Sequence, residues 1–141
     1  MSNYVVISSA NQATVILAGT QGAAGAITTV PNIFTVSADI AMISNKAVCA
    51  TSTGCNYADN SVKCNVLGIT NSAAVSGQQV TIMADGGMNG FSGLTQGQPV
   101  YLGSSGNLTQ TVPTSGFIQQ LGIATSTTSV NIRISTPIFL A

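Results

Sequence analysis

The sequence predicts an all-β protein, a small antiparallel β-barrel or sandwich domain with an extended N-terminal arm. Ser, Thr, Val and Ile are abundant, while Glu is absent and Lys is scarce, so the composition favours strands over surface helices. Residues 129–135 alternate, with Val130, Ile132 and Ile134 on one face, which is the period of a half-buried antiparallel strand. Turn residues recur between short apolar runs, as they do in sandwiches and small barrels. A chain of 141 residues is long enough for one hydrophobic core.

Residues 93–136 are predicted to form a meander that ends on the alternating strand. Two glycines at 103–107 suit a tight loop, because glycine adopts positive φ without steric cost. Pro and Gly at 113–116 indicate a second turn. The short runs between these turns are expected to pair with one another; they are 100–102, 108–112 and 117–124.

The main domain is placed at 39–141, and its first half is less regular. Residues 41–50 are predicted to form one long or bent strand, and 51–60 a polar loop. The next strands are expected at 61–69 and 79–84, with a connection of small residues at 71–77. Within the first of these, Gly68 marks a bulge or a close backbone approach. Asp85-Gly86-Gly87 predicts a turn after the second.

Residues 1–38 are assigned to the arm. Residues 4–7 and 14–17 are candidate strands, and glycines at 19, 22 and 25 indicate a flexible linker, since three glycines without proline are too few for a collagen triple helix. Residues 33–36 look extended and are expected to add either to the domain or to a neighbouring subunit.

The chain contains unusually few charged residues, and this limits the kinds of function that the sequence favours. Charged residues make up 4% of the chain, with zero net charge, whereas an average soluble protein has about 25%. Such a surface favours association, so a subunit of an assembly is the preferred interpretation.

Nucleic-acid binding is not expected, because there is no basic patch. No membrane span is expected either, since no apolar run reaches about 18–20 residues. No signal peptide is predicted, which places folding in a cytoplasm.

The residues that usually carry catalysis are scarce, so no enzyme activity is predicted. His is absent, and Asp39, Asp59 and Asp85 are far apart in the sequence, each in a segment that is expected to be a loop. The cysteines do not have the spacing of a zinc site, and no metal or organic cofactor is expected. Cys49 and Cys64 are predicted to be small buried side chains on strands, with Cys55 in a loop. A disulfide from Cys55 to either of them is an open alternative that a reducing cytoplasm disfavours.

The pattern of strands and turns from 41 to 141 resembles the β-domain of tailed-bacteriophage virion proteins, namely head decoration (cement) proteins and the C-terminal domains of some fibre proteins. The segments that carry the resemblance are 66–69, 73–77, 79–82, 86–88, 94–97, 99–102, 106–109, 116–119 and 121–124. The resemblance implies a virion structural protein on the capsid surface, assembled in the host cytoplasm. Its expected partners are the major capsid protein and further copies of itself, as a homotrimer. The alternative is a fibre or tail-associated module that binds a host surface receptor.

Apolar residues near the two ends of the chain are the candidate subunit interface. They are Val5, Val6, Ile7, Ile33, Phe34, Ile138, Phe139 and Leu140. Pro137 cannot continue a strand normally, yet three large apolar residues follow it. Two expectations remain open for them: burial in the parent domain, or a strap across a neighbouring subunit. Phe117 and Tyr101 are instead expected to pack in the core.

Overall fold

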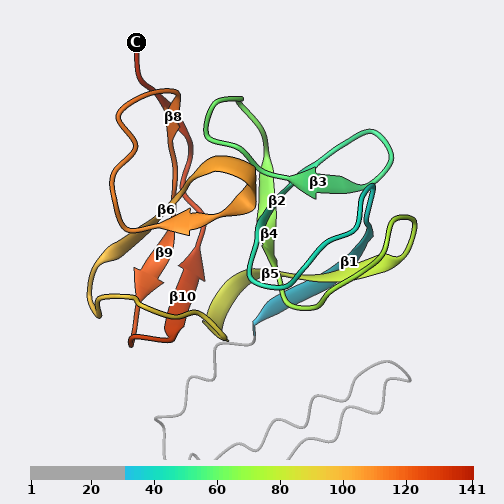
Figure 1. Ribbon diagram of the computed structural model, residues 1–141, viewed down its shortest axis with the longest axis horizontal. Coiled ribbons are helices and arrows are strands. Elements are labelled where there is room, and N and C mark those ends of the chain that lie inside the picture. Colours follow the sequence, from blue (N-terminus) through green and yellow to red (C-terminus); the bar gives the residue numbers. More distant parts are fainter. Residues whose placement is uncertain (1–30) are drawn as a thin grey trace, which may run out of the picture.

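The protein folds into a curled antiparallel sheet that forms a half-barrel (Figure 1). The computed structural model describes residues 31–141, so the predicted elements of the first 30 residues, and Val5, Val6 and Ile7 among them, lie outside it. The all-β prediction is confirmed, because the described chain contains strands and one 3-10 turn but no α-helix. The elements are β1 (Asn32–Ser37), β2 (Ala47–Ala50), β3 (Cys55–Tyr57), β4 (Val66–Thr70), β5 (Gln79–Asn89), β6 (Pro99–Leu102), η1 (Ser104–Gly106), β7 (Leu108–Thr109), β8 (Phe117–Ile118), β9 (Gln120–Ala124), β10 (Ser129–Arg133) and β11 (Ile138–Phe139).

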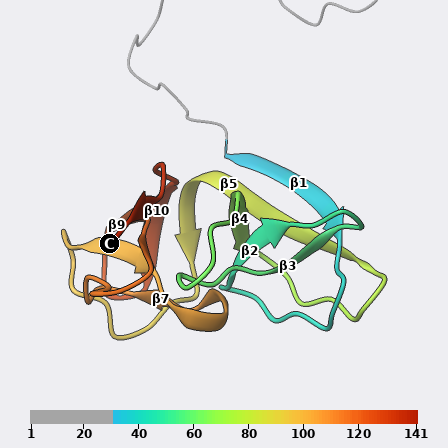
Figure 2. The same ribbon diagram turned by 90° about the horizontal axis from the view of Figure 1, so that it is seen from above.

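The long strand β5 holds the sheet together, as both views of the ribbon show (Figures 1 and 2). The order of the main sheet is β3-β2-β4-β5-β10-β9-β6-β7, and β1 also pairs with β5. β1 pairs with the first part of β5, from Gln79 to Asp85, and β10 pairs with the second part, from Asp85 to Asn89. β8 and β11 form a separate two-stranded sheet. Residues 32–37, assigned to the arm from the sequence, therefore contribute a strand to this sheet.

The turn predicted at Asp85-Gly86-Gly87 is wrong, because these residues continue β5. Asp85 lies opposite Arg133, Gly86 opposite Ile132 and Gly87 opposite Asn131. Gly86 has φ 109°, and a Cβ there would lie 3.0 Å from the Pro31 side chain. Glycine allows β5 to bend where it changes partners, and pairing with a strand more than 40 residues later overrides the local turn signature.

The first half of the sheet is buried on both faces. On β2, Ala47 and Cys49 belong to the main core, whereas Val48 belongs to a second core. Val80 and Ile82 of β5 join this second core, while Met83 joins the main one. The second core also contains Ala38, Met42 and Cys55, with Phe34, Val36, Tyr57, Leu67 and Ala74 packed against it.

The second half of the sheet is buried on one face only. Val130 and Ile132 of β10 are completely buried in the main core, whereas Asn131 and Arg133 are exposed, as the alternation predicts. The meander is confirmed in part: β7 pairs with β6, and β9 with both β6 and β10, but the run predicted at 117–124 is divided, because β8 belongs to the separate two-stranded sheet. Its tight loop is η1, in which Ser105 and Gly106 have φ of 52° and 74°.

Three predictions in the first half are corrected. Residues 41–50 are not one strand, since Asn45 adopts a left-handed φ of 64° and only β2 is regular. The supposed polar loop 51–60 contains β3, which pairs with β2 and places Cys55 in the second core. The strand expected at 61–69 begins only at β4.

Gly68 itself is a point of close backbone approach, as expected. A Cβ on this residue would collide with the Met83 carbonyl and lie 2.7 Å from Cγ2 of Ile82. The β2–β4 pairing also shifts register between Val48 and Cys49. Glycine is therefore needed for β4 to lie against β5.

Candidate interaction surfaces

The polar residues that sequence analysis singled out are used to hold loops. Thr51 and Thr53 donate their hydroxyls to the two carboxylate oxygens of Asp39, at 2.5 and 2.8 Å. Asp59 accepts hydrogen bonds from the Ser61 hydroxyl, the Ser61 backbone and the Ser105 backbone, and these bonds lower the pKa of its carboxyl group. Among the described residues, no group of three Cys, Asp, Glu or His side chains is placed to hold a metal ion.

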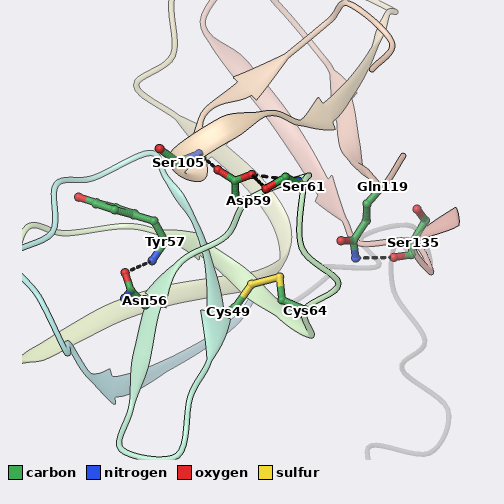
Figure 3. The surroundings of a disulfide bond; sticks show 9 residues. All are labelled: Cys49, Asn56, Tyr57, Asp59, Ser61, Cys64, Ser105, Gln119 and Ser135. Atoms are coloured by element: carbon green, nitrogen blue, oxygen red, sulfur yellow. Dashed lines mark hydrogen bonds between the residues drawn. A yellow bond between two sulfur atoms is a disulfide. The ribbon is translucent and has the colours of Figure 1, made fainter. Parts of the chain in front are cut away.

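The prediction that Cys49 and Cys64 are unpaired buried side chains is wrong. Cys49 and Cys64 form a disulfide across 15 residues, with their Cα atoms 5.9 Å apart (Figure 3). Cys55, the cysteine considered for pairing, is the free one and is completely buried. The spacing of the cysteines in the sequence does not indicate this pairing. The disulfide depends on how residues 58–65 fold back beside β2.

The two-stranded sheet β8–β11, called the C-terminal ribbon below, carries two neighbouring exposed large apolar side chains. Its strands pair Phe139 with Phe117 and Ile138 with Ile118. The two phenylalanine rings have centroids 5.1 Å apart, in a tilted arrangement. Ile138 is 64% exposed and Phe139 65%. Because successive strand residues point to opposite faces, both faces of the ribbon present an apolar pair.

The exposure of the C-terminal residues bears on the first of the two expectations for them, burial in the parent domain. Ile138 and Phe139 are not buried in the parent domain, although Leu140 is half-buried and its backbone N–H donates to the Gly116 carbonyl at 2.8 Å. The strap across a neighbour stays a prediction. Phe117, expected in the core, is half-buried and packs on Phe139, and Tyr101 is half-buried as well.

A second candidate surface is the outer edge of β1. Ile33 is 46% exposed, whereas Phe34 is half-buried against the second core. Within residues 31–141, β1 pairs with β5, and its other edge is approached only at its end, where Gly54 lies against Ser37 and Ala38 bridges to Cys55 of β3. An unpaired edge can accept a further strand through its backbone groups. Of the eight interface candidates, the structure thus places three on exposed surface: Ile33, Ile138 and Phe139.

The outer face of β9 and β10 carries two shallow hollows. One is lined chiefly by Gln120, Gly122, Ile123, Asn131 and Arg133. The other is lined by Asn131 and Arg133 together with Asp85, Gly86 and Gly87. Arg133 and Asp85 lie opposite each other on neighbouring strands, so the local charge is close to balanced. This face offers hydrogen-bonding groups around two hollows and a nearly balanced charge, which suits contact with another protein surface.

Comparison with known proteins finds no family model that matches this sequence and no curated protein similar to it. In the part of the chain that the structure covers, no helix has the length and apolarity that crossing a membrane requires. The candidate surfaces described above are therefore the basis for a functional proposal.

Proposed function

We propose that this protein is a structural subunit of a tailed-bacteriophage virion, a decoration or cement protein that binds the outer surface of the head. It would act without catalysis, as a homotrimer that contacts the major capsid protein. The observation that carries the proposal is the exposed C-terminal ribbon on a domain with almost no charge.

The mechanism is adhesion by apolar contact. Burying a large apolar side chain contributes about 1.5–3 kcal/mol, and Ile138 and Phe139 are both about two-thirds exposed. In a symmetric oligomer the same contact occurs once per protomer, so a modest contribution is multiplied by the number of subunits. A shell decorated in this way would gain stability from many weak and identical contacts.

The low charge supports the same proposal. The chain carries three basic and three acidic residues, so charge repulsion between copies packed side by side is small. The Ser- and Thr-rich outward faces can form hydrogen bonds without requiring a charged partner. A neutral surface of this kind suits close packing on a capsid better than it suits a freely diffusing protein.

Copy number in purified virions tests the proposal. Quantitative mass spectrometry of virions that contain this protein should give hundreds of copies per particle, at a fixed ratio to the major capsid protein. The alternative, a fibre or tail-associated module that binds a host receptor, predicts a few tens of copies or fewer. Heads should also lose the protein when Ile138 and Phe139 are both replaced by Ser, whereas a Val75→Ser control should remain bound, because Val75 is equally exposed but lies outside the ribbon.

A further inference from the structure

We infer that the Cys49–Cys64 disulfide is a reversible redox lock on residues 58–65, the loop that connects β3 to β4. This inference goes beyond the proposed virion role and does not depend on it. The lock is a covalent bond between β2, in the first half of the sheet, and a loop that also contacts η1 and β8.

The backbone of this loop bonds to three separate elements. The Ala58 N–H donates to the Ala47 carbonyl of β2 at 2.9 Å, and the Ala58 carbonyl accepts from Gly106 of η1 at 2.5 Å. The Asn60 carbonyl accepts from the N–H of Phe117 in β8 at 2.6 Å. The loop therefore fixes β8, and with it the C-terminal ribbon, relative to β2.

Side chains reinforce the same junction. Oδ1 of Asp59 accepts hydrogen bonds from both the hydroxyl and the backbone of Ser61, at 2.6 and 2.9 Å (Figure 3). Oδ2 accepts from the Ser105 backbone at 2.8 Å. Gly116 packs so closely on the loop that a Cβ there would lie 3.2 Å from the Ser61 Cα. The first part of the loop thus has a dense set of contacts.

The second part of the loop has few contacts besides the disulfide. Residues 61–65 lie outside the strands, and the side chains of Ser61, Val62, Lys63 and Asn65 are exposed, Val62 by 63%. Two backbone bonds hold this part, from Val62 to the Asp59 carbonyl at 3.2 Å and from Ala50 to the Asn65 carbonyl at 3.3 Å. A segment with so little burial opens locally once its covalent tie is cut.

The three cysteines differ in accessibility in a way that suits reversible exchange. Cys64 is half-buried, with its side chain against the main core, whereas Cys49 is only 7% exposed, so Cys64 is the more accessible member of the pair. Cys55 is completely buried, and burial, followed by the charge of Asp39, raises the pKa of its thiol. Exchange is therefore directed to the Cys49–Cys64 pair and away from Cys55.

The oxidation requires a low-molecular-weight disulfide such as glutathione disulfide. The Cys64 thiolate attacks one sulfur of this oxidant and releases one thiolate, leaving a mixed disulfide on Cys64. The Cys49 thiolate then attacks the Cys64 sulfur, forms the protein disulfide and releases the second thiolate. The two protons lost by the cysteines end on the two released thiols, so the protein pair is oxidised and the small disulfide is reduced.

The test compares the full-length protein in its oxidised and reduced forms. Thiol titration after unfolding should count one thiol per chain in the first form and three in the second. The reduced form should stay folded, with its melting temperature lower by about 10 °C, the shift expected for a disulfide that closes a loop of this size. Hydrogen exchange should accelerate at the amides of Val62 and Ala50, whose bonds hold the second part of the loop, and remain unchanged in β10. Glutathione disulfide should reverse both changes.

A Cys49→Ala/Cys64→Ala variant provides the matched control, because it should melt at the same temperature with and without reductant. Three outcomes would overturn the inference. The folded protein could retain three titratable thiols after oxidation, the reduced chain could be unfolded, or reduction could leave the melting temperature and the exchange at the loop unchanged. The first outcome denies the bond, the second makes it a requirement for folding rather than a lock, and the third denies its effect on the loop.

Discussion

The two halves of the sheet differ in how many of their faces are covered. β2, β4 and the first part of β5 lie between two cores, whereas β9, β10 and the second part of β5 cover the main core and leave their outer face exposed. A strand with one covered face shows alternation in its sequence, and a strand with two covered faces does not. β10, in the half with one covered face, could therefore be predicted from the sequence better than β2, in the other half.

The largest expected effect comes from the strand that lies between the two cores. Ile82→Ala should lower the free energy of unfolding by about 2–5 kcal/mol, because the side chain is completely buried and its removal leaves a cavity. Ile123→Ala is the matched control on the open face, where the side chain is 47% exposed, and should cost well under half as much. Urea unfolding of both variants measures the difference, and equal costs would remove the distinction between the two halves.

Close packing between β4 and β5 gives the next largest effect. Gly68→Ala should cost about 1–3 kcal/mol, since the added methyl group would meet the Met83 backbone and the Ile82 side chain. Gly87→Ala is the control in the second part of β5, where a Cβ would meet nothing within 4 Å, and should change stability by less than about 0.5 kcal/mol. Thermal melts of the two variants side by side test this, and a harmless Gly68→Ala would contradict the close approach of β4 to β5.

Local signals were enough for some elements and failed for others in both halves. The alternation of Val130 and Ile132 identified β10, and the two glycines flanking residues 104 and 105 identified the turn at η1. By contrast, the polar sequence around Cys55 hid β3, and Asp85-Gly86-Gly87 has the local chemistry of a turn although it lies in a strand. In both cases pairing with another strand decides the conformation, and a single sequence does not contain that information locally.

The residues proposed as a subunit interface also show that a single sequence does not reveal which strands pair. Large apolar residues after Pro137 indicated that the C-terminus needs a partner, and the structure leaves Ile138 and Phe139 exposed. The sequence did not indicate that β11 pairs with β8, because β8 looked like the start of a longer strand that continues into β9. Gln119 separates the two: it is buried, and its side-chain amide donates to the Ser135 carbonyl at 2.8 Å (Figure 3).

The smallest expected effect concerns the loop between β3 and β4. Hydrogen bonds from Ser61 and Ser105 hold the pKa of Asp59 below its reference value of 3.8, so the ionised carboxylate is favoured in the folded state. The resulting stability is fully present above the unfolded pKa and is lost as the pH falls through the lower folded value. Asp59→Asn should therefore flatten part of the decline in melting temperature between about pH 4 and pH 2. Asp85→Asn serves as the control at an exposed carboxylate outside the loop; a decline as steep in the Asp59→Asn variant as in the unaltered protein would contradict the role of this loop.

The central claim is that the C-terminal ribbon is an association surface of a nearly uncharged domain. Size-exclusion chromatography with light scattering tests it on the unaltered protein, on Phe139→Ala and on the equally exposed control Val75→Ala. At low micromolar concentration the unaltered protein and Val75→Ala should be oligomers of one size. Phe139→Ala should be a monomer whose melt shows an intact fold. A monomeric unaltered protein, or an unchanged oligomer in Phe139→Ala, would contradict the account.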